Sequence, residues 1–116
     1  MRFADKTAIY IPLGLTGIGK PIEQVAQIIT GSVGGVSITE IRGGYVMAAG
    51  NCHYERLCKY EWWHEGSDWI TTMVKRIARE LILEHDEESV LVEFTRGGLT
   101  EAHLLLPADI SEWDNG

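Results

Sequence analysis

The sequence predicts an α+β fold: a ferredoxin-like βαββαβ sandwich with an extra C-terminal strand, in which two helices cover one face of an antiparallel sheet. Residues 21–30 and 67–81 repeat apolar side chains at helical spacing, and strand-like segments precede, separate and follow them in that order. The length of 116 residues suits one hydrophobic core. We therefore expect a single domain over residues 1–116, with a polar C-terminal tail over residues 109–116.

The composition is that of a globular protein, with 45% hydrophobic and 23% charged residues. A net charge of −7 argues against nucleic acid as a partner, because phosphate binding needs clustered lysine and arginine. An acidic protein is better suited to a cationic ligand. We find no signal peptide, and no apolar run approaches the ~18 residues of a membrane span. The expected location is the cytoplasm, with no membrane partner.

The cysteine and histidine spacings do not predict a metal site. Cys52 and Cys58 lie six residues apart on one expected strand, which separates their Cα atoms by ~20 Å, too far for a disulfide bond. Reduced thiols are the expectation. Neither C-x-x-C nor H-x₃₋₅-H spacing occurs. We expect His64, His85 and His103 to be exposed, and neither a metal nor a cofactor to be needed.

The first expected strand covers residues 7–13, and a glycine-rich loop follows it. This loop, GLTGIGK at residues 14–20, matches the first seven positions of the phosphate-loop pattern G-x-x-x-x-G-K. Pro21 stands where that pattern needs a Ser or Thr for Mg²⁺. The missing hydroxyl favours the other interpretation, a loop whose backbone amides line a small-molecule site.

The first helix is expected to start at Pro21, whose missing N–H costs nothing at the first helical position. Its apolar face is Ile22, Val25, Ala26 and Ile29. Gly31 is expected to end this helix. A strand should follow at residues 36–41, and the Gly43-Gly44 pair should introduce a bulge or bend.

Residues 43–63 are expected to form a hairpin that turns at residues 50–51, Gly-Asn. The two arms carry Tyr45 and Glu55. A two-residue turn pairs Tyr45 with Arg56 and puts Tyr45 and Glu55 on opposite faces, whereas a three-residue turn pairs Tyr45 directly with Glu55. The sequence leaves both registers open.

Alternation on the second arm separates two faces. Tyr54, Cys58, Tyr60 and Trp62 share the face expected beneath the helices, and Glu55 shares the open face with Leu57, Lys59 and Glu61. The second helix, capped by Ser67 or Asp68, should bury Ile70, Met73, Val74, Ile77, Ala78 and Leu81. An acidic turn (84–88), a strand (90–94), a turn (96–98) and a last strand (101–106) complete the chain, and Trp113 is expected to tuck back from the tail.

The hairpin resembles that of the phage S-adenosylmethionine lyases. In that family a Gly-x-Tyr segment precedes an acidic-Glu-Lys segment that enters the next strand. This chain has Gly44-Tyr45 and, about ten residues later, Tyr54-Glu55-Arg56. In the family, a Gln-containing turn then runs into a Val-Leu-Val strand. Here the turn has Glu87 in place of that Gln before Val90-Leu91-Val92. The order of elements agrees over residues 8–106.

The resemblance implies an enzyme that cleaves S-adenosylmethionine to 5′-methylthioadenosine and L-homoserine lactone. The carboxylate of the substrate attacks its own γ-carbon, so the enzyme acts mainly by holding the reactive conformer. The resemblance implies catalytic roles for Glu55 and Tyr45. It implies substrate contacts for Glu87 and for the loop glycines Gly14, Gly17 and Gly19.

The family also assembles as a homotrimer with sites between subunits, and it starves methyl-dependent host restriction in infected bacteria. Two alternatives stay open at this stage. One is a lyase for an adenylylated S-adenosylmethionine signal, and the other is a non-catalytic ferredoxin-like module that binds a ligand or forms oligomers. What separates the module from an enzyme is whether Tyr45 and Glu55 converge on one pocket.

Overall fold

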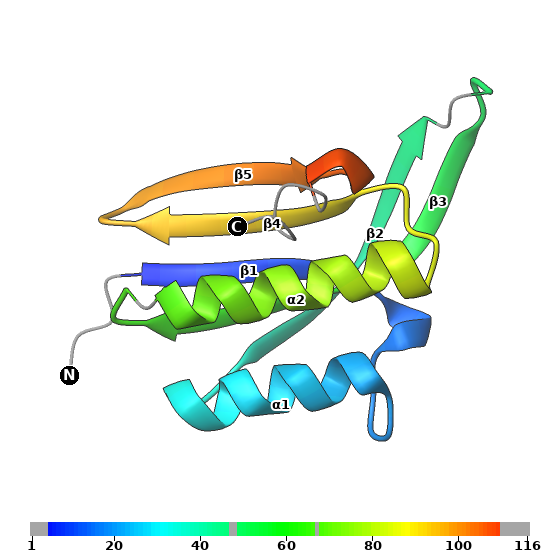
Figure 1. Ribbon diagram of the computed structural model, residues 1–116. Coiled ribbons are helices and arrows are strands. Elements are labelled where there is room, and N and C mark those ends of the chain that lie inside the picture. Colours follow the sequence, from blue (N-terminus) through cyan, green and yellow to red (C-terminus); the bar gives the residue numbers. More distant parts are fainter. Residues whose placement is uncertain (1–4, 47–48, 67, 110–116) are drawn as a thin grey trace.

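The computed structural model describes residues 5–46, 49–66 and 68–109 and forms one antiparallel sheet with both helices on the same face (Figure 1). The strands lie in the order β2-β3-β1-β4-β5. Their bounds are β1 Asp5–Pro12, β2 Ser37–Val46, β3 Cys52–His64, β4 Val90–Arg96 and β5 Leu99–Leu105; the helices are α1 Pro21–Val33 and α2 Asp68–Glu84. The ferredoxin-like α+β prediction is confirmed, with β5 as the extra edge strand.

The core lies between the helices and the sheet. The apolar side chains that periodicity assigned to each helix are buried, and they pack against Ile9 and Ile11 of β1 and Val92 of β4. Trp62 of β3 is fully buried, and its indole Nε1–H donates a hydrogen bond to Thr30 Oγ1 at 3.0 Å. Every buried side-chain N or O atom in the described part of the chain has a hydrogen-bond partner.

Two of the glycine predictions are wrong. Gly31 does not end α1, which continues to Val33 and ends where Gly34 adopts the left-handed conformation with φ 96°. Its N–H donates to the Thr30 carbonyl at 2.8 Å, which satisfies an orphan carbonyl of the last turn. Gly43 and Gly44 make no bulge either, because β2 runs through them in unbroken pairing with β3.

Neither of the two hairpin registers is found. β2 ends at Val46 and β3 begins at Cys52, so the connection is longer than either turn considered. Tyr45 pairs with His53, and Gly43 pairs with Glu55. A Cβ atom on Gly44 would lie 2.8 Å from the Tyr54 ring, which explains why glycine occupies this position on the continuous strand.

The two faces of β3 are largely as predicted. Cys58, Tyr60 and Trp62 are buried under the helices, but Tyr54 is exposed, since it lies on the arm of the β2–β3 hairpin that extends beyond them (Figure 1). Cys52 and Cys58 are free thiols, as expected. The tail prediction for Trp113 and the cap prediction for Ser67 fall outside the described residues, and no helix in the described part is long and apolar enough to cross a membrane.

One histidine prediction is also wrong. His64, at the end of β3, is 7% exposed and lies 2.8 Å from the hydroxyl of Thr7. It alternates onto the helix-covered face with Trp62, because the strand continues through it.

Candidate active site on the open face of the sheet

The open face, which is the sheet face opposite the helices, holds a cavity of about 560 Å³. This volume lies within the ~300–1,000 Å³ range of small-molecule sites. Five separate segments contribute its walls: the end of β1, both arms of the hairpin, the α2–β4 connection with the start of β4, and the end of β5. The lining residues are Tyr10, Pro12, Ile41, Gly43, Gly44, Val46, Glu55, Leu57, Glu87, Glu88, Ser89, Val90, Leu91, Leu104 and Leu106.

Glu55 and Glu87, both named as site residues from the sequence, line the same cavity from β3 and from the α2–β4 connection. Glu55 is half-buried on β3, opposite Gly43, so no side chain from its pairing partner stands over it. Glu87 follows α2, and its N–H donates to the Leu81 carbonyl at 3.2 Å. Asp86 adopts a left-handed conformation with φ 55° just before it, a conformation that Asp tolerates better than most residues. This turn delivers Glu87 to the cavity wall.

The surroundings of Glu87 disfavour its charged form. Burial raises the pKa of the Glu87 carboxyl, and the nearby charges of Glu55 and Glu88 raise it further. His53 and His85 act in the opposite direction without reversing the shift. The negative end of the α2 dipole also disfavours an anion here. A cation in the cavity would relieve this repulsion.

The rest of the cavity wall is largely apolar. Apolar side chains from all five strands contribute, among them Ile41, Leu57, Leu91 and Leu104. The cavity therefore combines apolar surface, suited to a flat ring or a methylene chain, with carboxylates that favour positive charge. Among the described residues that line it there is no Lys, Arg or His.

The other predicted site residues lie on β2 and in the β1–α1 loop. Tyr45 lies on β2 with its backbone opposite His53, and its side chain is outside the described part of the structure. Gly14, Gly17 and Gly19 lie in the β1–α1 loop and are not among the residues that line the cavity. Ile18 of this loop is 97% exposed, so the loop is a free surface in a single subunit.

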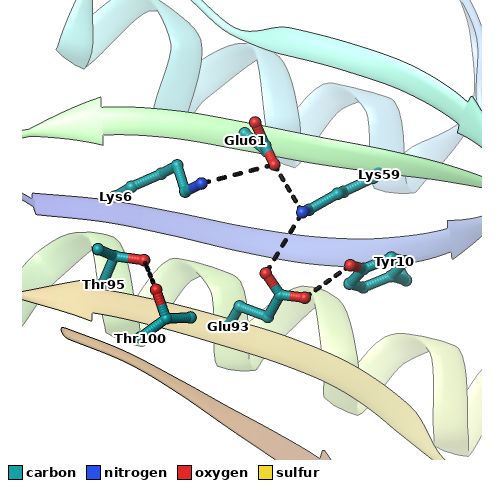
Figure 2. Close-up of polar contacts among 7 residues, drawn as sticks. All are labelled: Lys6, Tyr10, Lys59, Glu61, Glu93, Thr95 and Thr100. Atoms are coloured by element: carbon teal, nitrogen blue, oxygen red, sulfur yellow. Dashed lines mark hydrogen bonds and ion pairs between the residues drawn. The ribbon is translucent and has the colours of Figure 1, made fainter. Parts of the chain in front are cut away.

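A polar network occupies the centre of the open face beside the cavity (Figure 2). Tyr10 donates a hydrogen bond from its hydroxyl to Glu93 Oε1 at 2.6 Å. Lys59 Nζ lies 3.3 Å from Glu93 Oε2 and 2.7 Å from Glu61 Oε1, and Lys6 Nζ lies 3.8 Å from the same Glu61 oxygen. The network fixes Tyr10, which is the member that also lines the cavity.

The pKa directions in this network agree with its charges. The hydrogen bond to Glu61 is the largest of the contacts that raise the pKa of Lys59. Burial acts to raise the pKa of Glu93, but the Tyr10 hydroxyl and Lys59 outweigh it and hold that pKa below its usual value. Burial, followed by the Glu93 contact, raises the pKa of Tyr10. The phenol is therefore a neutral hydrogen-bond donor at neutral pH.

Sequence reasoning missed Tyr10 and Glu93. The two residues are 83 positions apart in the chain, and only the strand order places β4 beside β1. The available signal was alternation: Lys6 and Tyr10 occupy even positions of β1, and Glu93 faces Ala8 across the ladder. That signal indicates a polar open face but not which polar residues meet.

A second cavity, of about 530 Å³, lies on the helix side between α2 and the β4–β5 hairpin. Phe94, Leu99 and His103 are among its lining residues, and none of the predicted site residues is. The cavity on the open face is therefore the candidate active site.

Two solved structures share this fold. A phage SAM lyase in complex with S-methyl-5′-thioadenosine is 20% identical, with a TM-score of 0.63, covering 91% of this chain and 94% of that chain. A phage SAM lyase in the apo state is 21% identical, with a TM-score of 0.59, covering 90% of each chain. No family model matches the sequence, and no curated protein matches it either. At this identity the comparison establishes a shared fold, over nearly the whole length of both chains.

Proposed function

We propose that this protein is an S-adenosylmethionine lyase, which cleaves its substrate to 5′-methylthioadenosine and L-homoserine lactone. One observation carries the proposal. Glu55 and Glu87 line a single apolar-walled cavity of suitable volume, in a fold shared with a lyase that was solved with S-methyl-5′-thioadenosine bound. Carboxylates in an apolar cavity are suited to a ligand that carries a sulfonium, an ammonium and a flat ring.

The proposed reaction needs no external nucleophile and no proton transfer. A carboxylate oxygen of the substrate forms a bond to its own γ-carbon, and the bond from that carbon to sulfur breaks with both electrons going to sulfur. The sulfonium becomes a neutral thioether and the carboxylate becomes a lactone, so two opposite charges disappear. A water-poor cavity favours this step, because water stabilises the separated charges of the reactant more than the transition state.

We assign the residues as follows. Glu55 holds the positive end of the substrate, its ammonium or its sulfonium, and thereby folds the methionine chain into the reactive conformer. Tyr45 orients the substrate from the facing arm of the hairpin, and Glu87 contacts it from the α2–β4 connection. The proposal includes a homotrimer, in which the exposed loop with Gly14, Gly17 and Gly19 supplies backbone contacts to a neighbouring subunit's cavity.

The biological role that we propose follows from the chemistry. Removal of S-adenosylmethionine from the cytoplasm of an infected host would deprive methyl-dependent restriction systems of their cofactor. This part of the proposal is tested by plating phage on a restricting host that expresses either the protein or an inactive variant.

The decisive experiment incubates the purified protein with S-adenosylmethionine in ¹⁸O-labelled water and follows the products by mass spectrometry. The lyase reaction gives methylthioadenosine and unlabelled homoserine lactone, and lactone that later opens carries the label in its carboxyl group. Direct hydrolysis would put the label in the γ-hydroxyl group and contradict the lyase mechanism. A folded protein without turnover would favour a non-catalytic binding module or, if an adenylylated substrate reacts, the signal-cleaving alternative.

Glu55→Gln tests the residue assignment, and Glu40→Gln is its matched control. Glu40 lies on the neighbouring strand, on the other face of the sheet, in an exposed ion pair with Arg56. We expect Glu55→Gln to lower kcat/KM at least about 100-fold, which corresponds to ~2.7 kcal/mol of transition-state stabilisation. Glu40→Gln should stay within about twofold of the unsubstituted protein.

A further inference from the structure

We propose that Glu87 senses the charge at the sulfur position, so that the cavity retains a sulfonium and releases the neutral thioether. This inference rests on the proposed function and adds a specificity device to it. The substrate enters with a cationic sulfur, and the product methylthioadenosine leaves with a neutral one. A carboxylate close to that sulfur would favour the first molecule over the second.

The placement of Glu87 is the first ground for this proposal. The cavity receives Glu55 from β3, and Glu87 and Glu88 from the end of α2, with no cationic side chain among its described lining residues. Glu55 alone would neutralise one positive charge, but S-adenosylmethionine carries two. A second carboxylate on a different wall can bind the second cationic group while Glu55 binds the first.

The local sequence around Glu87 is the second ground. Acidic residues at a helix C-terminus oppose the helix dipole, and cations are the residues that stabilise this end. Here Glu84 is the last residue of α2, Glu87 and Glu88 follow, and the last turn has no basic residue. A departure from a local stability rule is expected where a residue serves function. The dipole and the carboxylates together make this end of the cavity attractive to a cation.

The charged groups around Glu87 determine how this preference depends on pH. Glu55 and Glu88 repel its negative charge, and His53 and His85 attract it in part. Because these surroundings raise the pKa of Glu87, its carboxyl takes up a proton at a higher pH than an ordinary glutamate does. A bound cation favours the ionised carboxylate, so binding of the cation should strengthen as the pH rises.

The test uses two unreactive ligands that differ only at the sulfur position. S-adenosylhomocysteine has a neutral thioether there, and sinefungin has a carbon bearing an amine, which is protonated. We expect the unsubstituted protein to bind sinefungin at least about tenfold more tightly than S-adenosylhomocysteine near pH 8, since ~1.4 kcal/mol of charge interaction gives this ratio of dissociation constants. Calorimetry measures both constants. Glu87→Gln should reduce the ratio to about twofold. Lowering the pH toward the raised pKa of Glu87 should reduce the ratio more in the unsubstituted protein than in the variant.

Glu84→Gln is the matched control, because Glu84 is at the same helix end but does not line this cavity. It should leave the ratio unchanged. An unchanged ratio in Glu87→Gln would overturn the inference while leaving the lyase proposal intact, provided that S-adenosylmethionine is still cleaved. If the protein shows no turnover but prefers the cationic ligand, and Glu87→Gln removes this preference, the inference is supported and the lyase proposal is contradicted. Failure of both ligands to bind would overturn both.

Discussion

The two faces of the sheet carry different kinds of side chain on the same three central strands. On the helix-covered face, β1, β3 and β4 contribute fully buried apolar side chains such as Ile9, Trp62 and Val92. On the open face, the same strands contribute Tyr10, Lys59 and Glu93, which bond to one another and remain partly exposed. The covered face provides a well-packed core, which leaves the open face free to carry carboxylates and a cavity that a core could not accommodate.

The difference between the two faces should have its largest effect at two adjacent tryptophans that lie on opposite faces. Trp62 is fully buried under the helices, and Trp63 is 46% exposed on the open face, with Lys6 Nζ 5.3 Å from its ring centre. We expect Trp62→Ala to lower the free energy of unfolding by about 3–5 kcal/mol, because a large cavity remains in the core. Trp63→Ala should cost less than about 1 kcal/mol. Urea unfolding followed by far-ultraviolet circular dichroism measures both values.

Equal losses for the two variants would contradict the assignment of the faces. A loss for Trp63→Ala that grows with protein concentration would instead indicate that a second subunit covers the open face. The pair therefore also provides a test of the proposed trimer.

A smaller effect is expected from the polar network on the open face. Lys59 lies between Glu61 and Glu93, with about a fifth of its side chain exposed. Lys59→Met should lower the free energy of unfolding by about 1–2 kcal/mol, since two partly buried carboxylates lose the cation between them. The loss should shrink in ~1 M salt, which screens the remaining repulsion.

The control for this prediction is Arg56→Met. It removes the ion pair with Glu40, whose N–O distance is 3.8 Å and whose side chains are 73% and 56% exposed. An exposed pair contributes at most about 1 kcal/mol, so this variant should remain close to the unsubstituted protein. If Arg56→Met costs as much as Lys59→Met, the network has no special stabilising role.

The sequence predicted the elements because their signals are local. Every helix position that apolar periodicity predicted to be buried is buried. Alternation correctly separated the two faces of β3 from Glu55 to Trp62. Both signals depend only on the order of residues within one segment. They do not depend on which distant strand pairs with it.

The hairpin register and the cavity could not be predicted in this way. The Gly50-Asn51 signal indicated a tight turn, but the strands end earlier, and Tyr45 pairs with His53. The cavity has walls from β1, the hairpin, the α2–β4 connection and β5, so it can be predicted only when the strand order is known. Glu55 and Glu87 were found by resemblance, whereas Tyr10 and Glu93 meet only through long-range pairing.

The smallest predicted effect concerns the one buried histidine of the covered face. The Gly66 N–H donates a hydrogen bond to His64 Nδ1 at 3.1 Å. The Nε2 atom therefore carries the proton of the neutral ring, and it donates a hydrogen bond to the Thr7 hydroxyl oxygen. Burial lowers the pKa of His64, with Arg96 acting in the same direction and Asp5 against it. The neutral form is therefore the one that the folded protein holds.

The sign of the resulting pH dependence follows from this lowered pKa. The unfolded chain takes up the proton near pH 6.5 and the folded protein only at a lower pH. Stability is therefore complete above about pH 6.5 and falls as the pH drops toward the lowered pKa. We expect a loss below about 1 kcal/mol between about pH 7.5 and 5.5, and His64→Gln should remove it.

Urea midpoints for both proteins across this range provide the measurement, and the difference between them isolates His64. This subtraction is needed because Glu87 on the open face has a raised pKa, which acts with the opposite sign: its contribution to stability is lost as the pH rises. If the two proteins lose stability in parallel as the pH falls, His64 is not the source. The loss would then come from another group whose pKa folding lowers, and Glu87 would not be its source, because its raised pKa predicts a gain in stability as the pH falls.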